Sequence, residues 1–192
     1  MQNILKRSVY WIGSVDEKHC DQVLEKLTAL CKDNDTEEAT LFICSGGGDT
    51  KVCFAFYDIV RTLHLNLTTV ASGEASSAAV IVWLAGLHRL ITPHTVVFLH
   101  ENEKKMHDGV QLRPIEMESQ TRQAKATREQ YVKIMASASS GKCSREVVRK
   151  LLAQNTVLEP SETIKYGMAH GILKQRTRWT LLSRSPVRAV FS

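Results

Sequence analysis

Residues 73–79 (GEASSAA) join a strand-like run at residues 67–71 (LTTVA) to a strongly apolar segment that continues to residue 87. Small residues at such a junction let a strand turn sharply into a buried helix, whose first N–H groups have no partner inside the helix. A serine in this turn, Ser76 or Ser77, holds its hydroxyl near amide donors and the positive end of the helix dipole. A serine among small residues is often only structural, so its neighbours must decide its role.

Two other segments flank this turn in the sequence. Residues 42–48 (FICSGGG) read as an apolar strand leading into three glycines, which offer backbone N–H groups to a developing oxyanion. Residues 95–99 (TVVFL) read as a strand that ends at His100, a candidate general base. The glycines could instead form a tight turn, but they are contiguous, unlike a dinucleotide fingerprint, and lack the Gly-Lys-Ser/Thr of a P-loop. The three segments together favour a serine-type acyl-transfer site.

Strand and helix patterns alternate along the first hundred residues. We expect strands over residues 8–12, 39–44, 67–71, 90–91 and 95–99. We expect one helix to be capped by Asp16 or Ser14, a second by Asp49 or Thr50, and a third to run from Ser76 to Leu87. This alternation is typical of right-handed βαβ units and a largely parallel sheet, in which function collects where strands end and helices begin.

The second half of the chain has a different character. Residues 101–113 are polar and predict a loop, and Pro114 then opens a long charged helix over about residues 115–135. Because few of its positions are apolar, this helix predicts an arm that reaches a neighbouring subunit; a solvent-washed helix is the alternative. Ser144 caps a helix through Leu152, and a short helix begins at Glu159 and ends at Gly167.

The bulk composition indicates one globular domain over residues 1–173 and a basic tail over residues 174–192. The 192 residues are 43% hydrophobic and 23% charged, and five of the 25 lysines and arginines lie in the tail, which has no acid. We do not infer nucleic-acid binding from the tail. Five cysteines without a CxxC pair argue against a disulfide framework or a zinc site. No apolar stretch is long enough for a membrane span and the first seven residues do not resemble a secretory signal, so a cytoplasmic protein is expected.

The chain resembles the proteolytic subunit of the Clp protease, a serine peptidase of the crotonase-like fold, over about residues 7–173. Residues 42–48 resemble that family's strand followed by Asn-Ser-Pro-Gly-Gly, and residues 73–77 resemble its Gly-Gln-Ala-Ala-Ser. The remaining matches are the first strand and turn at residues 7–16 (RSVYWIGSVD), the helix at 55–58 (AFYD), the strand at 97–100 (VFLH), and the closing segment with Glu162, residues 166–169 (YGMA) and Ile172.

The resemblance implies a role for each site residue. Ser77, rather than Ser76, would be the nucleophile and His100 the base, while the amides of Gly48 and Ala78 would bind the oxyanion. Asn155, twelve residues before Gly167, takes the position of the family's catalytic aspartate. In a serine protease of another fold, changing this aspartate to asparagine lowers turnover by about 10⁴-fold. The family's proline is replaced here by Gly46, and its Met-Gly after the serine by Ala78 and Ala79.

The same resemblance implies an α/β, crotonase-like (Clp protease) fold with repeated βαβ units, whose protruding long helix makes the contact between rings. It implies stacked rings, formed by a homo-oligomer or a hetero-oligomer with a paralogous subunit. An AAA+ ATPase unfoldase would feed unfolded polypeptide to the rings and dock on apolar clefts, for which Phe42 is a candidate. No metal, organic cofactor, nucleic acid or membrane is implied.

Two alternatives to an active peptidase stay open. A catalytically weak or inactive ring subunit with a structural or regulatory role is suggested by Asn155. An acyl-CoA enzyme of the wider crotonase-like group would use the glycine amides to polarise a thioester, without Ser77 or His100.

Overall fold

The computed structural model describes residues 7–32, 38–101 and 113–174 of the chain. Helices and strands alternate in its first part: β1 (Ser8–Ile12), α2 (Glu17–Lys32), β2 (Ala39–Ser45), α3 (Thr50–Thr62), β3 (Leu67–Ser76), α4 (Ala78–Leu84), β4 (His88–Ile91) and β5 (Val96–Leu99). The later elements are α5 (Pro114–Ala138), α6 (Arg145–Ala153), β6 (Thr156–Leu158), α7 (Pro160–Lys165) and β7 (Gly171–Ile172). The expected basic tail beyond residue 174, and most of the loop expected over residues 101–113, lie outside the described residues.

The described strands form one sheet in the order β1-β2-β3-β4-β7, and β5 pairs with β3 and with β6. Every ladder is parallel except that between β5 and β6. The largely parallel α/β sheet predicted from the alternation of elements is therefore confirmed. The sequence patterns did not reveal β6 or β7, because strands of three and two residues are too short to show alternation.

β3 changes partner halfway along its length. Its first part pairs with β4 up to Ala71, and its last residues pair with β5, where Ser76 lies opposite Phe98. The Thr95 hydroxyl bridges the change, since it donates to the Ala71 carbonyl at 3.0 Å and accepts from the Gly73 N–H at 3.2 Å. β3 therefore runs five residues beyond its expected end and carries the chain to the edge of β5.

α4 lies in the centre of the core, and all seven of its residues are buried, as its apolar sequence predicts. The predicted extent, residues 76–87, was wrong at both ends. The helix begins only after Ser77, whose backbone φ of +54° is not helical, and it is capped at Ala85. Gly86 then passes so close to Thr69 on β3 that a side chain at position 86 would overlap the Thr69 side chain.

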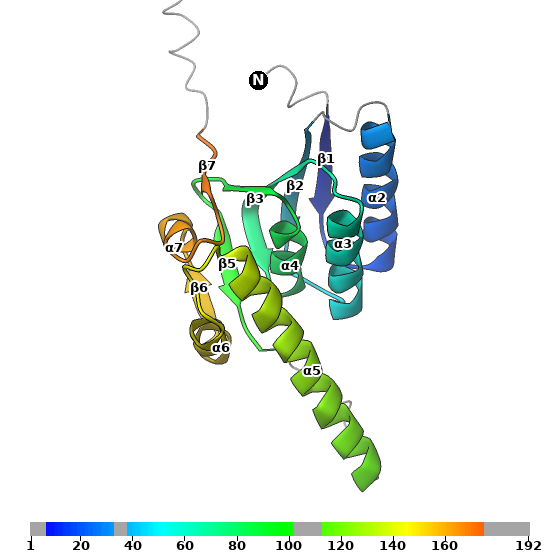
Figure 1. The fold of residues 1–192 in the computed structure, drawn as a ribbon, viewed down its shortest axis with the longest axis vertical. Helices are drawn as coiled ribbons and strands as arrows, with labels where there is room; N and C mark the ends of the chain where they lie inside the picture. Colours follow the sequence, from blue (N-terminus) through cyan, green and yellow to red (C-terminus); the bar gives the residue numbers. More distant parts are fainter. Residues whose placement is uncertain (1–6, 33–37, 102–112, 175–192) are drawn as a thin grey trace, which may run out of the picture.

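α5 contacts the rest of the described molecule mainly through its C-terminal end. Its buried residues are Tyr131, Val132 and Met135, although its 25 residues span about 37 Å. Figure 1 shows the N-terminal part of the helix extending away from the sheet. There Ile115 is 65% exposed and Met117 56% exposed. The predicted long helix is confirmed, with Pro114 in its first turn.

The caps expected for three other helices are also present. Asp49 accepts from the Lys51 N–H in front of α3, and Ser144 accepts from the Val147 N–H in front of α6. Asp16 accepts from the His19 N–H at the start of α2. No helix among the described residues combines the length and apolar character that crossing a bilayer requires.

Candidate active site

Ser77 occupies a strained turn between β3 and α4. Its backbone dihedrals, φ +54° and ψ −124°, are unusual for a residue with a side chain, and such a conformation costs about 1–3 kcal/mol. The Ser77 N–H donates to the carbonyl of Phe98 on β5 at 3.0 Å, which fixes the turn against the neighbouring strand. The side chain does not cap α4. A serine on a sharp strand-to-helix turn presents its hydroxyl at the end of the sheet, as a nucleophile requires.

The neighbouring Ser76 has a different environment. It is the last residue of β3, is 3% exposed, and donates its hydroxyl to Glu74 Oε1 at 2.7 Å. A hydroxyl held by a carboxylate inside the strand is less available than one at the turn. The local geometry therefore separates two serines that spacing alone leaves equivalent.

The glycine run lies directly against this turn. A Cβ added to Gly47, which has a φ of +101°, would lie 2.8 Å from the Ser77 Cβ and 3.3 Å from the Ala78 nitrogen. The Gly47 carbonyl accepts from the Val15 N–H at 2.9 Å. Because the N–H and C=O of a trans peptide point in opposite directions, the N–H of Gly48 points away from Val15.

Ala78 provides a second main-chain donor at the turn. It is the first residue of α4, so its N–H has no acceptor within the helix. The structure thus brings the Gly47–Gly48 peptide next to Ser77 and the Ala78 amide. The sequence analysis selected the glycines and the serine turn from two separate segments. One donor at a helix N-terminus and one in the adjacent glycine loop, both beside a hydroxyl, form an arrangement suited to binding a developing oxyanion.

His100 follows the end of β5, beside the same turn. Its ring stacks on that of Phe98, with centroids 5.1 Å apart and planes at 16°. Its Nδ1 lies 2.7 Å from the backbone carbonyl oxygen of Glu101. Since a carbonyl can only accept, Nδ1 carries the proton of this bond, and in the neutral ring Nε2 keeps its lone pair. A ring in this tautomer can accept a proton at Nε2.

Asn155 lies across from His100. The last pair in the antiparallel β5–β6 ladder is Leu99 with Thr156, so the next residues along each strand are His100 and Asn155. Asn155 is exposed and adopts a φ of +50° in the turn between α6 and β6. Within the described part of the chain, no hydrogen bond joins the side chains of Ser77, His100 and Asn155. The backbones of these three residues therefore lie near one another. Their side chains do not form a chain of hydrogen bonds from the Ser77 hydroxyl through the His100 imidazole to the Asn155 amide.

Two residues of α5, Tyr131 and Arg128, also reach this region, although the sequence analysis did not select them. The Tyr131 hydroxyl lies 3.8 Å from Cys53 Sγ and interacts with the Ser77 side chain. Burial raises the pKa of Cys53 to about 12, and burial raises the pKa of Tyr131 further above its ordinary value. Both groups therefore stay protonated near neutral pH.

Arg128 lies one turn before Tyr131 and forms an ion pair with Glu101, with Nη2 2.7 Å from Oε1. The residue paired with Arg128 is thus the one whose carbonyl holds the His100 ring. α5 therefore contacts the candidate site near Ser77, through Tyr131, and near His100, through the pair between Arg128 and Glu101. The only sequence signal was that Arg128 and Tyr131 share a helix face three residues apart, which does not reveal what that face meets.

A group of three or more His, Cys, Asp or Glu side chains able to hold a metal ion does not occur among the described residues. Cys20, Cys44, Cys53 and Cys143 carry free thiols.

The chain is an α/β protein with a mostly parallel sheet, in which a strained serine lies beside main-chain donors and a histidine follows the next strand end. The family model for Clp protease matches residues 1–176, and the chain belongs to this family. The resemblance stated from the sequence, and with it the crotonase-like α/β fold, is confirmed.

The curated relatives are distant. The chain is 27% identical over 173 residues to the chloroplastic ATP-dependent Clp protease proteolytic subunit 4 of Arabidopsis thaliana, covering 88% of this chain and 57% of that protein. It is 24% identical over 169 residues to ATP-dependent Clp protease proteolytic subunit 1 of Chlamydia trachomatis, covering 87% and 86%. It is 26% identical over 176 residues to the subunit 1 of Rhodococcus jostii, covering 90% and 78%. The chain thus spans little more than half of the Arabidopsis protein.

Proposed function

We propose that this chain is a serine-type endopeptidase subunit that cleaves unfolded polypeptide inside a ring-shaped, ATPase-assisted degradation complex. The observation that carries the proposal is the strained Ser77 turn, which lies beside the Gly47–Gly48 peptide and the free first amide of α4, with His100 at the adjacent strand end. The names of the relatives, which are proteolytic subunits of ATP-dependent proteases, support the same function.

In the proposed acylation step, the Ser77 oxygen attacks a peptide carbonyl carbon while Nε2 of His100 takes the hydroxyl proton. The negative charge that develops on the carbonyl oxygen accepts hydrogen bonds from the N–H groups of Gly48 and Ala78. Collapse of this intermediate breaks the C–N bond, and His100 returns the proton to the leaving amine. Water then repeats the attack on the acyl-serine, again with His100 as base, and frees Ser77.

The group that orients His100 in this mechanism is the main-chain carbonyl of Glu101. Its oxygen lies 2.7 Å from Nδ1 and accepts the Nδ1–H, which leaves Nε2 as the basic nitrogen. An uncharged carbonyl or the amide of Asn155 stabilises the imidazolium less than a carboxylate does, so the site works more slowly than one with an aspartate. Substrate binding would draw Ser77 and His100 into hydrogen-bond contact, as catalytic bonds are often long in unoccupied sites.

A serine-directed fluorophosphonate probe tests this function. We expect the assembled wild-type protein to be labelled at Ser77, the label to be lost in Ser77→Ala and in His100→Ala, and the matched variant Ser76→Ala to keep it. Labelling that persists in Ser77→Ala would reject Ser77 as the nucleophile.

Assembly into stacked rings, as a homo-oligomer or with a paralogous subunit, would use the free part of α5. The exposed apolar side chains of Ile115 and Met117 near the start of that helix support such a contact. A proline at Ala126 should break the helix and reduce the particle mass in light scattering. An unchanged mass would argue against α5 as the ring contact.

An apolar cleft supports docking of an AAA+ ATPase. It has a volume of about 250 Å³ and is formed by neighbouring strands, with Phe42 of β2, Val70 of β3 and Leu90 of β4 in its walls. Phe42 stacks on Tyr10, which is 55% exposed, at a centroid distance of 5.5 Å. An exposed apolar groove of this kind suits an apolar loop of a partner. Phe42→Ser should weaken ATPase-dependent degradation while leaving fluorophosphonate labelling intact.

A second candidate function is a ring subunit with little hydrolytic activity, and a specific observation favours it. Among the described residues, no hydrogen bond joins the Ser77 hydroxyl to the His100 ring, and the position across from His100 holds Asn155 rather than a carboxylate. If this arrangement persists in the assembled protein, Ser77 is not activated, and the chain would contribute structure or regulation. Absence of labelling of assembled wild-type protein would support this alternative.

A further inference from the structure

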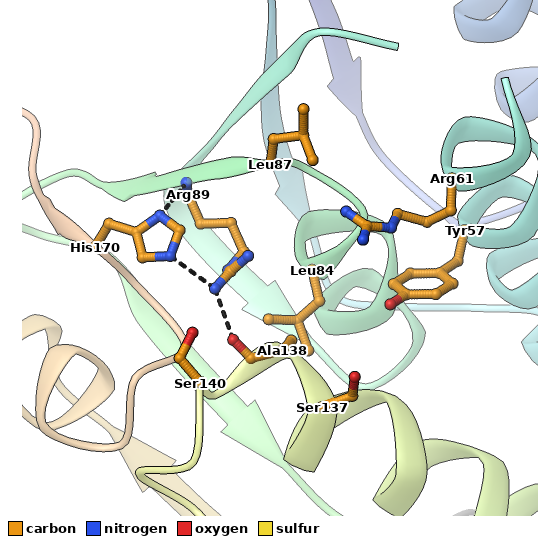
Figure 2. Close-up of a pocket in the computed structure, with 9 residues that line it drawn as sticks. All are labelled: Tyr57, Arg61, Leu84, Leu87, Arg89, Ser137, Ala138, Ser140 and His170. Carbon is orange, nitrogen blue, oxygen red and sulfur yellow. Dashed lines mark hydrogen bonds between the residues drawn. The ribbon is translucent and has the colours of Figure 1, made fainter. Parts of the chain in front are cut away.

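A polar cavity of about 220 Å³ lies between α3, the start of β4 and the C-terminal end of α5. Figure 2 shows it in close-up, with side chains from all of these elements and His170 directed toward one space. Its polar lining comes from Tyr57, Arg61, Arg89, Ser137, Ser140 and His170, and none of its lining residues is an aspartate or glutamate. None of the candidate catalytic residues lines it, so it is separate from the site around Ser77.

Arg89 is a buried cation without a matching anion. It is 6% exposed, and its guanidinium donates to three main-chain carbonyls: Nε to Met168 at 2.8 Å, Nη1 to Gly86 at 3.1 Å and Nη2 to Ala138 at 2.7 Å. No carboxylate pairs with it in the described part of the molecule. A guanidinium has five N–H groups, so two remain without a carbonyl acceptor. A buried charge that lacks a counter-charge is costly, and an anion in the cavity would remove this cost.

The contact between Arg89 and His170 also calls for an acceptor. Both ring nitrogens of His170 face donors of Arg89: Nδ1 lies 3.1 Å from the backbone nitrogen, and Nε2 lies 2.8 Å from Nη2. A neutral imidazole ring has only one lone pair, so one contact is a hydrogen bond and the other sets two donors against each other. Figure 2 draws both contacts between His170 and Arg89 as dashed lines. One oxygen of an anion placed there would accept from both of the opposed donors.

The other cationic group is Arg61 of α3, an exposed side chain in the wall opposite Arg89. It has no salt-bridge partner among the described residues. Burial lowers the pKa of His170, and repulsion from the nearby basic groups Arg89, His88 and Lys142 lowers it further. All charged groups around the cavity are thus basic, while the hydroxyls of Tyr57, Ser137 and Ser140 add neutral donors.

We propose that this cavity binds the phosphate group of a small phosphorylated molecule, with the phosphate held between Arg61 and Arg89. Arginine forks match tetrahedral oxyanions in geometry and charge, and hydroxyl groups complete the donor set. The volume is below the range of about 300–1,000 Å³ typical of sites for drug-sized ligands, so the ligand is a compact one. The site joins the end of α5 to β4, and it does not depend on the proposed peptidase function.

Inorganic phosphate is the probe for the test, compared with chloride at matched ionic strength. We expect phosphate to raise the melting temperature of the full chain and to shift the NMR signals of the His170 ring in a saturable manner. Arg61→Gln should weaken phosphate binding about tenfold, because it removes a charge-assisted hydrogen bond, and Arg61→Lys should have a smaller effect. Ser137→Ala, a favourable helix substitution, should weaken binding less than Arg61→Gln.

Lys51→Gln is the matched control, because it removes one positive charge from the same helix outside the cavity. An equal loss of binding in Arg61→Gln and Lys51→Gln would overturn the proposal, since only general charge attraction would remain; binding by Arg61→Gln equal to that of the wild type would overturn it as well. The proposal would also fail if phosphate leaves the His170 signals unchanged while Arg61→Gln alters the particle mass. In that case an acidic side chain of another copy would occupy the cavity.

Discussion

Nδ1 of His100 lies 2.7 Å from the main-chain carbonyl oxygen of Glu101, the residue directly after it in the chain. A neighbouring carbonyl can therefore fix the ring tautomer that leaves Nε2 basic. It supplies no negative charge to balance the imidazolium that forms during acylation. The Glu101 carbonyl thus orients the His100 ring without stabilising the positive charge of its protonated form.

Asn155→Asp should raise the rate of fluorophosphonate labelling by at least about tenfold, because a carboxylate opposite His100 would stabilise the protonated ring. The measurement is the second-order labelling rate of assembled protein at pH 8. Gln154→Glu adds the same charge one residue earlier and should leave the rate within about twofold. Equal rates for both variants would show that the position of the new charge is unimportant and would remove Asn155 from the site.

Arg128→Gln should slow labelling several-fold without a large loss of stability. The Arg128–Glu101 pair is only partly buried, so it contributes about 0–1 kcal/mol to folding. Its role is to hold Glu101, and through it His100, so the pH–rate profile should also shift. Arg122→Gln is the control on the same helix, since Arg122 pairs with Glu118 in a more exposed position. If the two variants behave alike, Arg128 does not position His100.

Gly47→Ala should abolish labelling and destabilise the protein. Its new Cβ would lie 2.8 Å from the Ser77 Cβ and 2.9 Å from the Ser76 carbonyl oxygen, and the backbone φ of +101° is strained for alanine. Gly46→Ala is the control, because its Cβ would meet nothing closer than Glu74 Oε1 at 3.7 Å. We expect Gly46→Ala to retain labelling, as measured alongside urea unfolding. Full activity of Gly47→Ala would contradict the close approach of this loop to Ser77.

The free energy of unfolding should fall as the pH rises above about 9. Burial raises the pKa of Cys53 from 9.0 to about 12, and the pKa of Tyr131 moves in the same direction. Between about pH 9 and pH 12 the Cys53 thiol releases its proton in the unfolded chain but keeps it in the folded chain. The free energy of unfolding therefore falls by up to about 1.4 kcal/mol per pH unit for each thiol or phenol that behaves in this way. Urea unfolding at several pH values measures this slope, and Cys53→Ala should make it shallower. An identical slope in the variant would exclude Cys53 as a source of the alkaline instability.

The sequence identified the segments around Ser77, the glycine run and His100 because each is marked locally, by small residues at the end of an apolar strand or by a histidine after one. The end of α4 was misplaced, since apolar residues continue to Leu87 while the chain already turns at Ala85. Apolar character shows that a segment is buried, but it does not show where the backbone changes direction.

The contacts of Arg128 and Tyr131 could not be predicted for a different reason. They join α5 to residues 27 and 78 positions away, and helical spacing gives no information on such distant partners. The pairing of Asn155 with His100 depends on β6, whose three residues carry no periodic pattern. The cavity around Arg89 was missed as well, because a single arginine in an apolar run gives no sign that it is buried and lacks a carboxylate.

The short β6 strand makes an exposed turn unexpectedly intolerant of changes in length. Strand side chains alternate between the two faces of a sheet, so one residue inserted between Leu152 and Thr156 would turn each β6 side chain to the opposite face or shift its partner. Substitutions in this turn at positions other than Asn155 would be absorbed, whereas an insertion or a deletion would remove Asn155 from its place across from His100. Among variants of this chain, the spacing in that turn should therefore be preserved more strictly than the identity of its residues.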